Sequence, residues 1–303
     1  MFTDVLSSED LNLALKNMRR IGLFILNMIL FMNTQKVSGG ELKFVKTITA
    51  PELNSVYDLA LQNDDLWIPD YRNNQVLHFS QDKVVRSFPG LPNPHSVALD
   101  PEGNFYVTDL HGNMVSKFDP KGKRLLQFGS QGSGQGEFMG AVCVRVGKSG
   151  NIYVADYKNH RIQKFGPQGH FLKAWGKEGG NPGEFCLPHG LALDADENIY
   201  VADRKNGRIQ VFDPEGSLIR MVNPKQLIEP LGVFVDDHRA IWVAEITHHS
   251  ILKFSPEGNL LFSFGENGSN TGEFVTPTNV CADKKGQLYV TEEGNARIQV
   301  FQE

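Results

Sequence analysis

A repeating unit of about 40 to 47 residues constrains the fold of this chain more than any other feature. The unit is clearest in GNIYVADYKNHRIQKFGPQG from Gly150 and in ENIYVADRKNGRIQVFDPEG from Glu197. Each copy has an apolar strand that ends in an acidic residue, a second strand of alternating polarity and a turn that contains Gly. All-β units with this period are typical of propeller blades, because one unit cannot bury its apolar faces alone.

The acidic residue at the end of the apolar strand, called the marker acid below, shows how many units the chain contains. It recurs six times, with spacings of 39, 47, 47, 42 and 47 residues, at Asp70, Asp109, Asp156, Asp203, Glu245 and Glu292. Each unit is predicted to form four short strands. In the unit around Asp203 these strands span residues 190–193, 199–202, 208–212 and 218–221.

The two ends of the repeat region complement each other. The last unit stops after three strands at Phe301, and residues 42–49 (LKFVKTIT) form an extra strand before the first unit. A propeller closes by pairing such terminal strands, which removes exposed sheet edges. We therefore expect an all-β, six-bladed β-propeller over residues 41–303, closed by the N-terminal strand on the C-terminal blade.

Residues 1–40 differ from the repeats in composition. Basic residues at positions 16, 19 and 20 precede a 12-residue apolar run at 21–32, and small residues follow at 38–40. This arrangement is typical of a signal peptide and is short for a membrane span. We predict a signal peptide or signal anchor with a short linker, and a secreted or luminal protein with no stable membrane span. The sequon at Asn267 would then carry a glycan.

The net charge and the cysteine content argue against nucleic-acid binding and against a cysteine-based metal site or disulfide framework. The formal net charge of −5 opposes binding to a phosphate backbone, so nucleic acid is not an expected partner. The three cysteines, Cys143, Cys186 and Cys281, are an odd number without metal-site spacing. We expect them to pack in the core rather than to form a disulfide framework.

The units resemble NHL repeats over nearly all of residues 51–303. They share the apolar strand, the Asp, the Arg-Ile-Gln-aromatic strand and the Asp-Pro-Gly turn. Two stretches, LPHGLALDADENIYVADRKNGRIQVF from Leu187 and NPHSVALDPEGNFYVTD from Asn93, look similar to the lyase domain of peptidylglycine α-amidating enzymes. That resemblance implies a zinc enzyme that cleaves peptidyl-α-hydroxyglycine to a peptide amide and glyoxylate, with zinc held by three His.

Of the three positions where the family has zinc-binding His, two hold His in this chain. The position fourteen residues before the acidic marker should face one mouth of the central channel, and it holds His95 and His189 in blades two and four. The third ligand position holds Thr278, whose hydroxyl is a poor substitute for imidazole. We therefore predict a weakened zinc site. Asn279 stands where the family has a calcium-binding Asp, so a structural calcium is doubtful.

Three further residues correspond to catalytic positions of the family. Tyr157 matches the catalytic Tyr, and Arg204 matches the Arg that contacts substrate. Arg72 is offset by one position from the family's Arg in blade one. The resemblance thus predicts a peptidylamidoglycolate lyase-like activity on a peptide that ends in α-hydroxyglycine. The alternative is a non-catalytic extracellular NHL propeller that binds a protein partner on its face.

Overall fold

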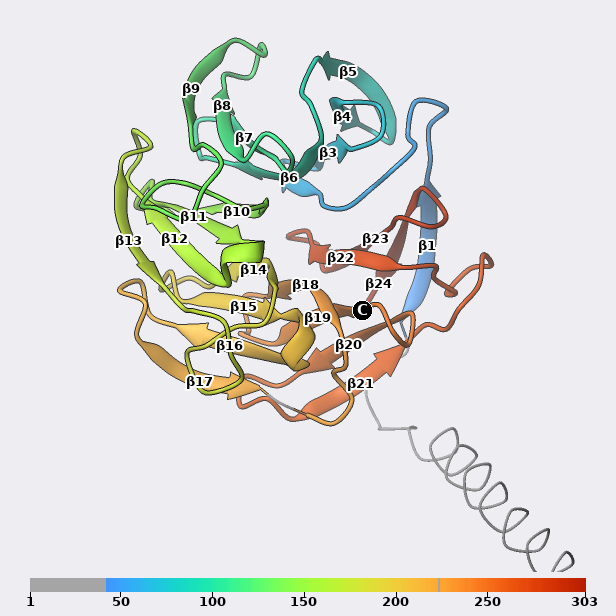
Figure 1. Cartoon of the computed structure of the whole chain (residues 1–303). Coiled ribbons are helices and arrows are strands. Elements are labelled where there is room, and N and C mark those ends of the chain that lie inside the picture. The colour runs from blue at the N-terminus through green and yellow to red at the C-terminus, as the bar shows by residue number, and fades with distance from the viewer. Residues whose placement is uncertain (1–41, 223) are drawn as a thin grey trace, which may run out of the picture. The chain divides into compact units, whose positions relative to one another are not determined.

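The computed structural model describes residues 42–222 and 224–303, which form six four-stranded antiparallel sheets. The sheets are arranged as the blades of a propeller, which confirms the predicted fold (Figure 1). The leader predicted at residues 1–40 lies outside the described residues. Within the described residues, no helix has the length and apolar character needed to cross a bilayer.

The first three blades follow the chain in order, from the innermost to the outermost strand. Blade one contains β2 (Ala60–Gln62), β3 (Asp65–Asp70), β4 (Gln75–Ser80) and β5 (Lys83–Pro89). Blade two contains β6 (Pro94–Leu99), β7 (Phe105–Asp109), β8 (Met114–Phe118) and β9 (Arg124–Phe128). Blade three contains β10 (Ala141–Val146), β11 (Ile152–Asp156), β12 (Arg161–Phe165) and β13 (Phe171–Trp175).

The remaining blades repeat this pattern, and a short 3-10 helix follows the second strand in blades three and four. Blade four contains β14 (Pro188–Leu193), β15 (Ile199–Asp203), β16 (Arg208–Phe212) and β17 (Leu218–Val222). Blade five contains β18 (Pro230–Val235), β19 (Ile241–Glu245), β20 (Ser250–Phe254) and β21 (Leu260–Phe264). Blade six contains β22 (Pro277–Ala282), β23 (Gln287–Glu292), β24 (Arg297–Gln302) and β1 (Lys43–Ile48). The helices are η1 (Tyr157–Asn159) and η2 (Arg204–Asn206).

Blade six is closed by the N-terminal strand, as predicted. Strand β1 pairs antiparallel with β24, with Ile48 opposite Ile298 and Phe44 opposite Phe301. Figure 1 shows β1, in blue, beside the red strands of the C-terminus. Ile48 is 1% exposed and packs with residues of blades one and six. Strand β1 therefore completes the last sheet.

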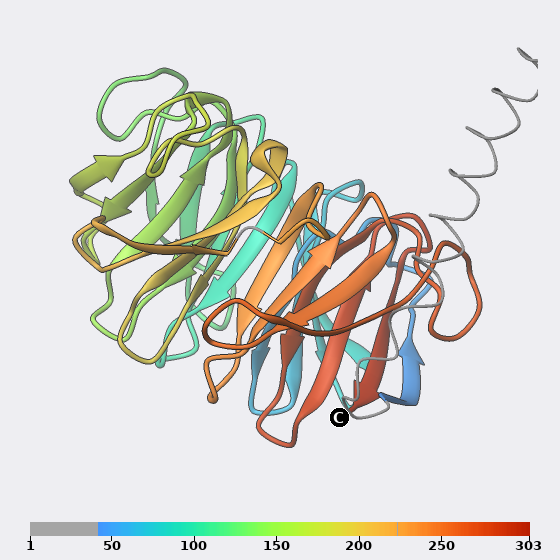
Figure 2. The same cartoon turned by 90° about the horizontal axis from the view of Figure 1, so that it is seen from below.

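The hydrophobic core lies between neighbouring blades rather than in one central mass. In one cluster, Cys143 and Tyr153 of blade three pack against Leu191 and Val201 of blade four. Figure 2 shows the blades side by side. The other core clusters likewise join residues of two neighbouring blades. The phenylalanines of the three GEF tripeptides, Phe138, Phe185 and Phe274, are fully buried in these seams. Their predicted role in packing between blades is confirmed.

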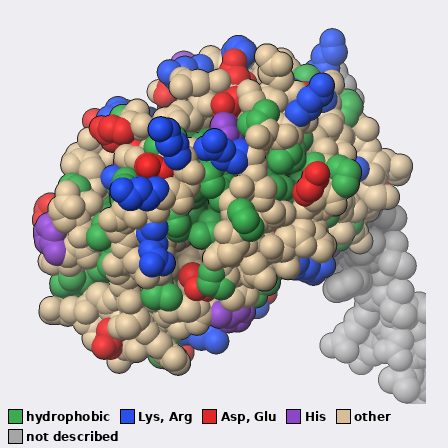
Figure 3. Space-filling view, turned by 90° about the horizontal axis from the view of Figure 1, so that it is seen from above, with side chains coloured by type: hydrophobic (Ala, Val, Ile, Leu, Met, Phe, Trp, Pro, Cys, Tyr) green, Lys and Arg blue, Asp and Glu red, His purple; other side chains and the backbone are tan. Residues whose placement is uncertain are grey.

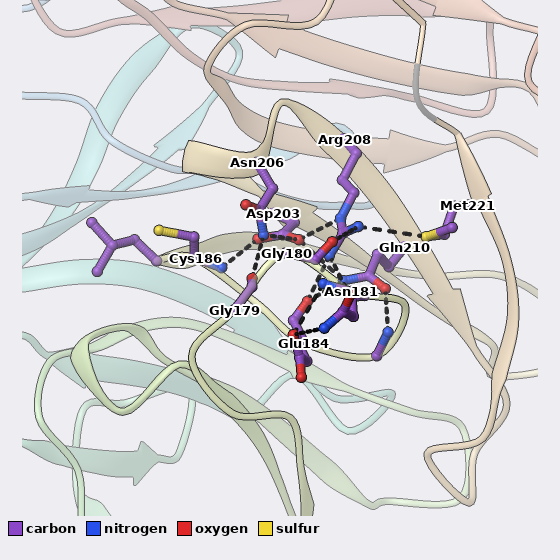
Figure 4. A network of polar contacts seen from close by, with 12 residues as sticks. Gly179, Gly180, Asn181, Glu184, Cys186, Asp203, Asn206, Arg208, Gln210 and Met221 are labelled. Carbon is purple, nitrogen blue, oxygen red and sulfur yellow. Dashed lines mark hydrogen bonds and ion pairs between the residues drawn. The ribbon is translucent and has the colours of Figure 1, made fainter.

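In every blade except blade two, the marker acid accepts a backbone N–H of the segment that precedes the blade. Figure 4 shows the contacts of this residue in blade four. The buried carboxylate of Asp203 accepts hydrogen bonds from Arg208 Nε at 2.7 Å, Gln210 Nε2 at 3.1 Å and Asn206 Nδ2 at 2.9 Å. Its other oxygen accepts the backbone N–H of Cys186 at 2.7 Å. One buried charge therefore fixes the end of β15, the start of β16 and the incoming loop.

The arginine of this network satisfies the loop backbone. Arg208 donates to the carbonyl oxygens of Gly180, Asn181 and Glu184 at 2.8 to 2.9 Å. Asp156 with Arg161, and Glu292 with Arg297, form the same network in blades three and six. A charged side chain thus replaces the partners that loop carbonyls would otherwise find in water.

The surface charge is uneven. On the face shown in Figure 3, Lys and Arg side chains gather around exposed hydrophobic side chains. The negative net charge of the sequence is therefore not spread evenly over the surface.

We predict that β1 is needed for stability through its buried side. Ile48→Ala should lower the free energy of unfolding by about 2–5 kcal/mol, because it leaves a cavity between blades. Val45→Ala, an exposed substitution in the same strand, should change it by less than about 0.5 kcal/mol. Urea denaturation measures both. Equal effects of the two variants would contradict the closure role of β1.

We also predict that the marker network stabilises the blade. Arg208→Ala should cost about 3–5 kcal/mol, because it leaves the Asp203 carboxylate buried without its cation. The matched control is Lys177→Ala, which removes an exposed ion pair to Glu184 of the same loop. It should cost less than about 1 kcal/mol. Chemical denaturation of both variants tests this, and a loss below 1 kcal/mol for Arg208→Ala would refute it.

Candidate functional site

A β-bulge places the ring of residues that faces the channel mouth. In blade two the pairing of β6 with β7 shifts between Pro94 and Val97, and in blade four that of β14 with β15 shifts between Pro188 and Leu191. Blades three, five and six have a shift at the same point. A bulge re-aims side chains at the rim of a sheet. The residues held in the bulges are His95, Val142, His189, Leu231 and Thr278.

His95 and His189 meet at the axis, as their shared repeat position predicted. Their ring centroids are 5.2 Å apart, with the rings edge to face. His95 Nδ1 donates to the carbonyl of Val142 at 2.7 Å. The His95 ring is therefore oriented by the equivalent bulge residue of the next blade. For His95 this leaves the lone pair of Nε2 free.

Both imidazoles are held in the neutral form. Burial lowers the pKa of His95 below its ordinary value of 6.5. Burial lowers the pKa of His189 further, and the nearby His95 ring and Arg204 guanidinium add to the effect. Although the His189 ring keeps some contact with solvent, protein surrounds it on most sides. Neutral imidazoles are the form that binds a metal ion.

The donor set fits zinc only in part. Thr278 is buried and donates its hydroxyl to the carbonyl of Val56 at 2.8 Å, with Thr291 Oγ1 also 2.8 Å away. It is absent from the lining of the pocket above the two imidazoles. Within residues 42–222 and 224–303, no three His, Cys, Asp or Glu are grouped closely enough to hold a metal. These residues offer a zinc ion two imidazoles, and a backbone carbonyl orients that of His95.

Tyr157 and Arg204 lie beside His189, brought there by the same local structure in successive blades. Each directly follows its marker acid and opens a 3-10 helix, which ends in a left-handed residue at φ 55° or 61°. Tyr157 meets the His189 ring edge-on at 5.9 Å. Arg204 Nη1 donates to the Tyr157 hydroxyl at 3.2 Å. The predicted pair is thus in contact in the structure.

Arg204 is also paired with an acid that the sequence did not single out. Its Nε and Nη2 donate to Glu229 at 3.2 and 3.0 Å, and Lys205 binds the same carboxylate. Hydrogen bonds from Lys205 and Arg204 hold the pKa of Glu229 below its ordinary value. Glu229 therefore stays ionised and fixes the guanidinium beside Tyr157.

Arg72 lies at the rim rather than with the other predicted residues. Its side chain is 58% exposed and pairs with Glu293 at 3.2 Å. It does not line the pocket, whereas Glu293 does. The one-residue offset in blade one thus turns Arg72 outward.

Four pocket residues, Tyr57, Tyr71, His111 and Glu293, were not among the predicted site residues. Tyr57 stacks on His95 at 4.6 Å, and Tyr71 meets both rings edge-on. The Tyr71 hydroxyl lies 2.7 Å from His111 Nε2. Burial, followed by a hydrogen bond with Glu293, raises the pKa of Tyr57 above its ordinary value. The sequence places Tyr71 directly after the first marker acid, at the repeat position of Tyr157 and Arg204. Nothing in the sequence predicts its contact with His111.

These residues line one cavity of about 510 Å³. The predicted residues His95, His189, Tyr157 and Arg204 all contribute to its wall. So does Lys158, for which the described residues offer no ion-pair partner. The cavity is large enough for a small ligand and combines aromatic walls with a few polar groups, as binding sites usually do.

Below the imidazoles the channel is closed by a buried ion pair. Arg145 donates to both oxygens of Asp58, at 2.9 and 3.1 Å, and Ser96 Oγ donates to the same carboxylate at 2.5 Å. Asn279 Nδ2 also bonds Asp58. Calcium requires six to eight oxygen ligands. Here the acid nearest Asn279 already binds a guanidinium, so these residues do not fit the calcium ion that the resemblance implied.

The other singled-out residues lie apart from the cavity. Cys143 is buried, Cys186 and Cys281 are partly buried, and all three are free thiols. Two histidines of blade five are held by local contacts, His248 by Glu245 at 2.9 Å and His249 by the Thr276 N–H at 3.1 Å. Asn267 is exposed in the loop before blade six, and its glycosylation stays a prediction.

Comparisons with known proteins agree with the architecture. The family described as NHL repeat matches residues 91–118, 138–165, 185–212 and 274–301. A search of curated proteins finds no significant match. Among solved structures, the chain is similar to virginiamycin B lyase from Staphylococcus aureus, an inactive variant with quinupristin. The identity is 14% and the TM-score 0.65, over 87% of this chain and 100% of that chain.

A second similar structure is a gluconolactonase from Xanthomonas campestris. It is 15% identical with a TM-score of 0.67, over 88% of this chain and 96% of that chain. Identities this low show a shared fold and leave activity to the site itself. Together with the six sheets and the four matched repeats, they place the chain: it is a six-bladed β-propeller that contains NHL repeats in blades two, three, four and six.

Proposed function

We propose that this propeller is a lyase that cleaves peptidyl-α-hydroxyglycine to a peptide amide and glyoxylate. The observation that carries the proposal is the convergence of His95, His189, Tyr157 and Arg204 in one cavity. His95 and His189 share one position of the repeat, and Tyr157 and Arg204 share another. The fold also supports lyase chemistry elsewhere, since virginiamycin B lyase shares it.

In this proposal His95 and His189 hold a zinc ion through Nε2. The other ring nitrogen of His95 donates to a backbone carbonyl, which is the usual arrangement of a metal-bound His. When bound, zinc would act as a Lewis acid that polarises the substrate hydroxyl. With two imidazoles instead of three, the affinity should be weaker than that of a three-His site.

The side chains around the imidazoles would supply the remaining chemistry. Tyr157 would accept the proton of the substrate hydroxyl, because the Arg204 guanidinium stabilises negative charge on the phenol oxygen. Lys158 and Arg204 both line the cavity. The two cations would bind the substrate carboxylate. A secreted protein would meet such peptides in the secretory pathway, and secretion stays part of the proposal.

A non-catalytic binding propeller is the second candidate. Arg204 is already paired with Glu229, and Thr278 is turned away from the pocket. Both observations favour a pocket that binds a partner without reacting with it. Zinc content and turnover separate the two functions.

We predict that zinc binding depends on the two axial imidazoles. His95→Ala or His189→Ala should lower zinc affinity at least 10-fold, because only one imidazole remains. His248→Ala, outside the cavity, should leave it unchanged. Calorimetric titration with zinc alone, with circular dichroism as the check on folding, measures this. Equal affinity in all four proteins would rule out the site.

We predict that Tyr157→Phe abolishes glyoxylate release from N-benzoyl-α-hydroxyglycine and leaves zinc binding intact. Loss of a general base commonly costs about 10²–10⁴-fold in rate. Thr278→His should raise zinc affinity and turnover, provided that a thermal melt shows the variant folded. If neither the zinc-loaded wild type nor Thr278→His releases glyoxylate, the lyase proposal fails and the binding propeller takes its place.

A further inference from the structure

The cavity contains two copies of one arrangement, related by the repeat. His189 of blade four is met edge-on by Tyr157, the residue after the marker acid of blade three. The Tyr157 hydroxyl then bonds Arg204, which comes from the loop of the blade that carries the histidine. Each copy is thus an imidazole, a phenol from the preceding blade and a group bound to that phenol.

Blades one and two form the second copy. His95 of blade two is met edge-on, at 6.4 Å and 87°, by Tyr71, the residue after the marker acid of blade one. The Tyr71 hydroxyl lies 2.7 Å from Nε2 of His111, which comes from the loop of blade two. The repeat therefore duplicates the phenol at the second imidazole, with a different partner.

The two partners differ in what they can do with a proton. Arg204 is a permanent cation that Glu229 holds in place, so Tyr157 is suited to accept a proton. His111 is exposed, and its Nε2 is the donor to the Tyr71 oxygen whenever that nitrogen carries the proton. The phenol proton of Tyr71 is then free to point into the cavity.

We propose that Tyr71 is a second catalytic residue, the general acid that protonates the departing amide nitrogen. This inference rests on the lyase function proposed above, whose reaction needs an acid as well as a base. The substrate presents both sites, a hydroxyl to be deprotonated and an amide nitrogen to be protonated. Tyr157 and Tyr71 match these two sites, one beside each axial imidazole.

The step balances in atoms and electrons. The substrate O–H proton passes to Tyr157 as the C=O bond of glyoxylate forms. The C–N bond breaks, and its electron pair goes to nitrogen. Nitrogen takes the Tyr71 proton, and the Nε2 proton of His111 passes to the Tyr71 oxygen. Solvent returns a proton to His111, and no oxidant or reductant is consumed.

The test compares two substrates that differ in their need for an acid. N-(4-nitrobenzoyl)-α-hydroxyglycine has a better leaving amide than N-benzoyl-α-hydroxyglycine, so it depends less on protonation of nitrogen. Tyr71→Phe in the zinc-loaded full chain should lower kcat for the benzoyl substrate about 100-fold or more, and less for the nitrobenzoyl substrate. His111→Gln should show the same pattern with a smaller loss. Tyr157→Phe should lower kcat for both substrates alike.

The controls separate this inference from the proposed function. Tyr200→Phe, a buried tyrosine outside the cavity, should leave kcat and KM unchanged. Zinc titration of Tyr71→Phe should match the wild type. If the wild type is active and Tyr71→Phe slows both substrates equally, or changes KM alone, Tyr71 is not the acid and the lyase proposal stands. If the zinc-loaded wild type releases no glyoxylate, both proposals fall together.

Discussion

The buried carboxylate at the end of the second strand is the interaction on which the rest of this propeller depends. In blade four, Asp203 binds Arg208, and Arg208 binds three carbonyls of the incoming loop. The charge is costly to bury and is stabilised only while all its partners are in place. It therefore links strand ends and loop into one unit. Tyr157 and Arg204 directly follow such carboxylates, so their positions inherit that rigidity.

The arginine and the long loop occur together in this chain. Blades three, four and six follow a marker spacing of 47 residues, and each has Arg and Gln five and seven residues after the marker. Blades two and five follow spacings of 39 and 42 residues and have Met114 and Ser250 at the Arg position. A shorter loop presents fewer carbonyls, so an arginine there would lack acceptors. The length of the loop before a blade and the presence of an arginine five residues after the marker acid thus vary together.

The sequence predicts most of the fold, because its signals are local and repeated. The strands expected in blade four, 190–193 to 218–221, differ from the observed ones by two residues or fewer at each end. The pairing of Tyr71 with His111 could not be predicted, since it joins loops of different blades. Asp58 was missed because it lies 12 residues before its marker acid, whereas the corresponding residue of blade six, Asn279, lies 13 residues before its own. The turn of Thr278 away from the cavity depends on Thr291, which no pattern singles out.

The bulge at the start of the innermost strand fixes where a side chain points without fixing which residue stands there. Backbone pairing sets the direction of the bulged side chain, and blades two to six carry His, Val, His, Leu and Thr there on one scaffold. The backbone therefore holds this ring of positions around the axis whichever side chain occupies them. Related propellers could acquire or lose a ligand set by single substitutions, without any change in topology.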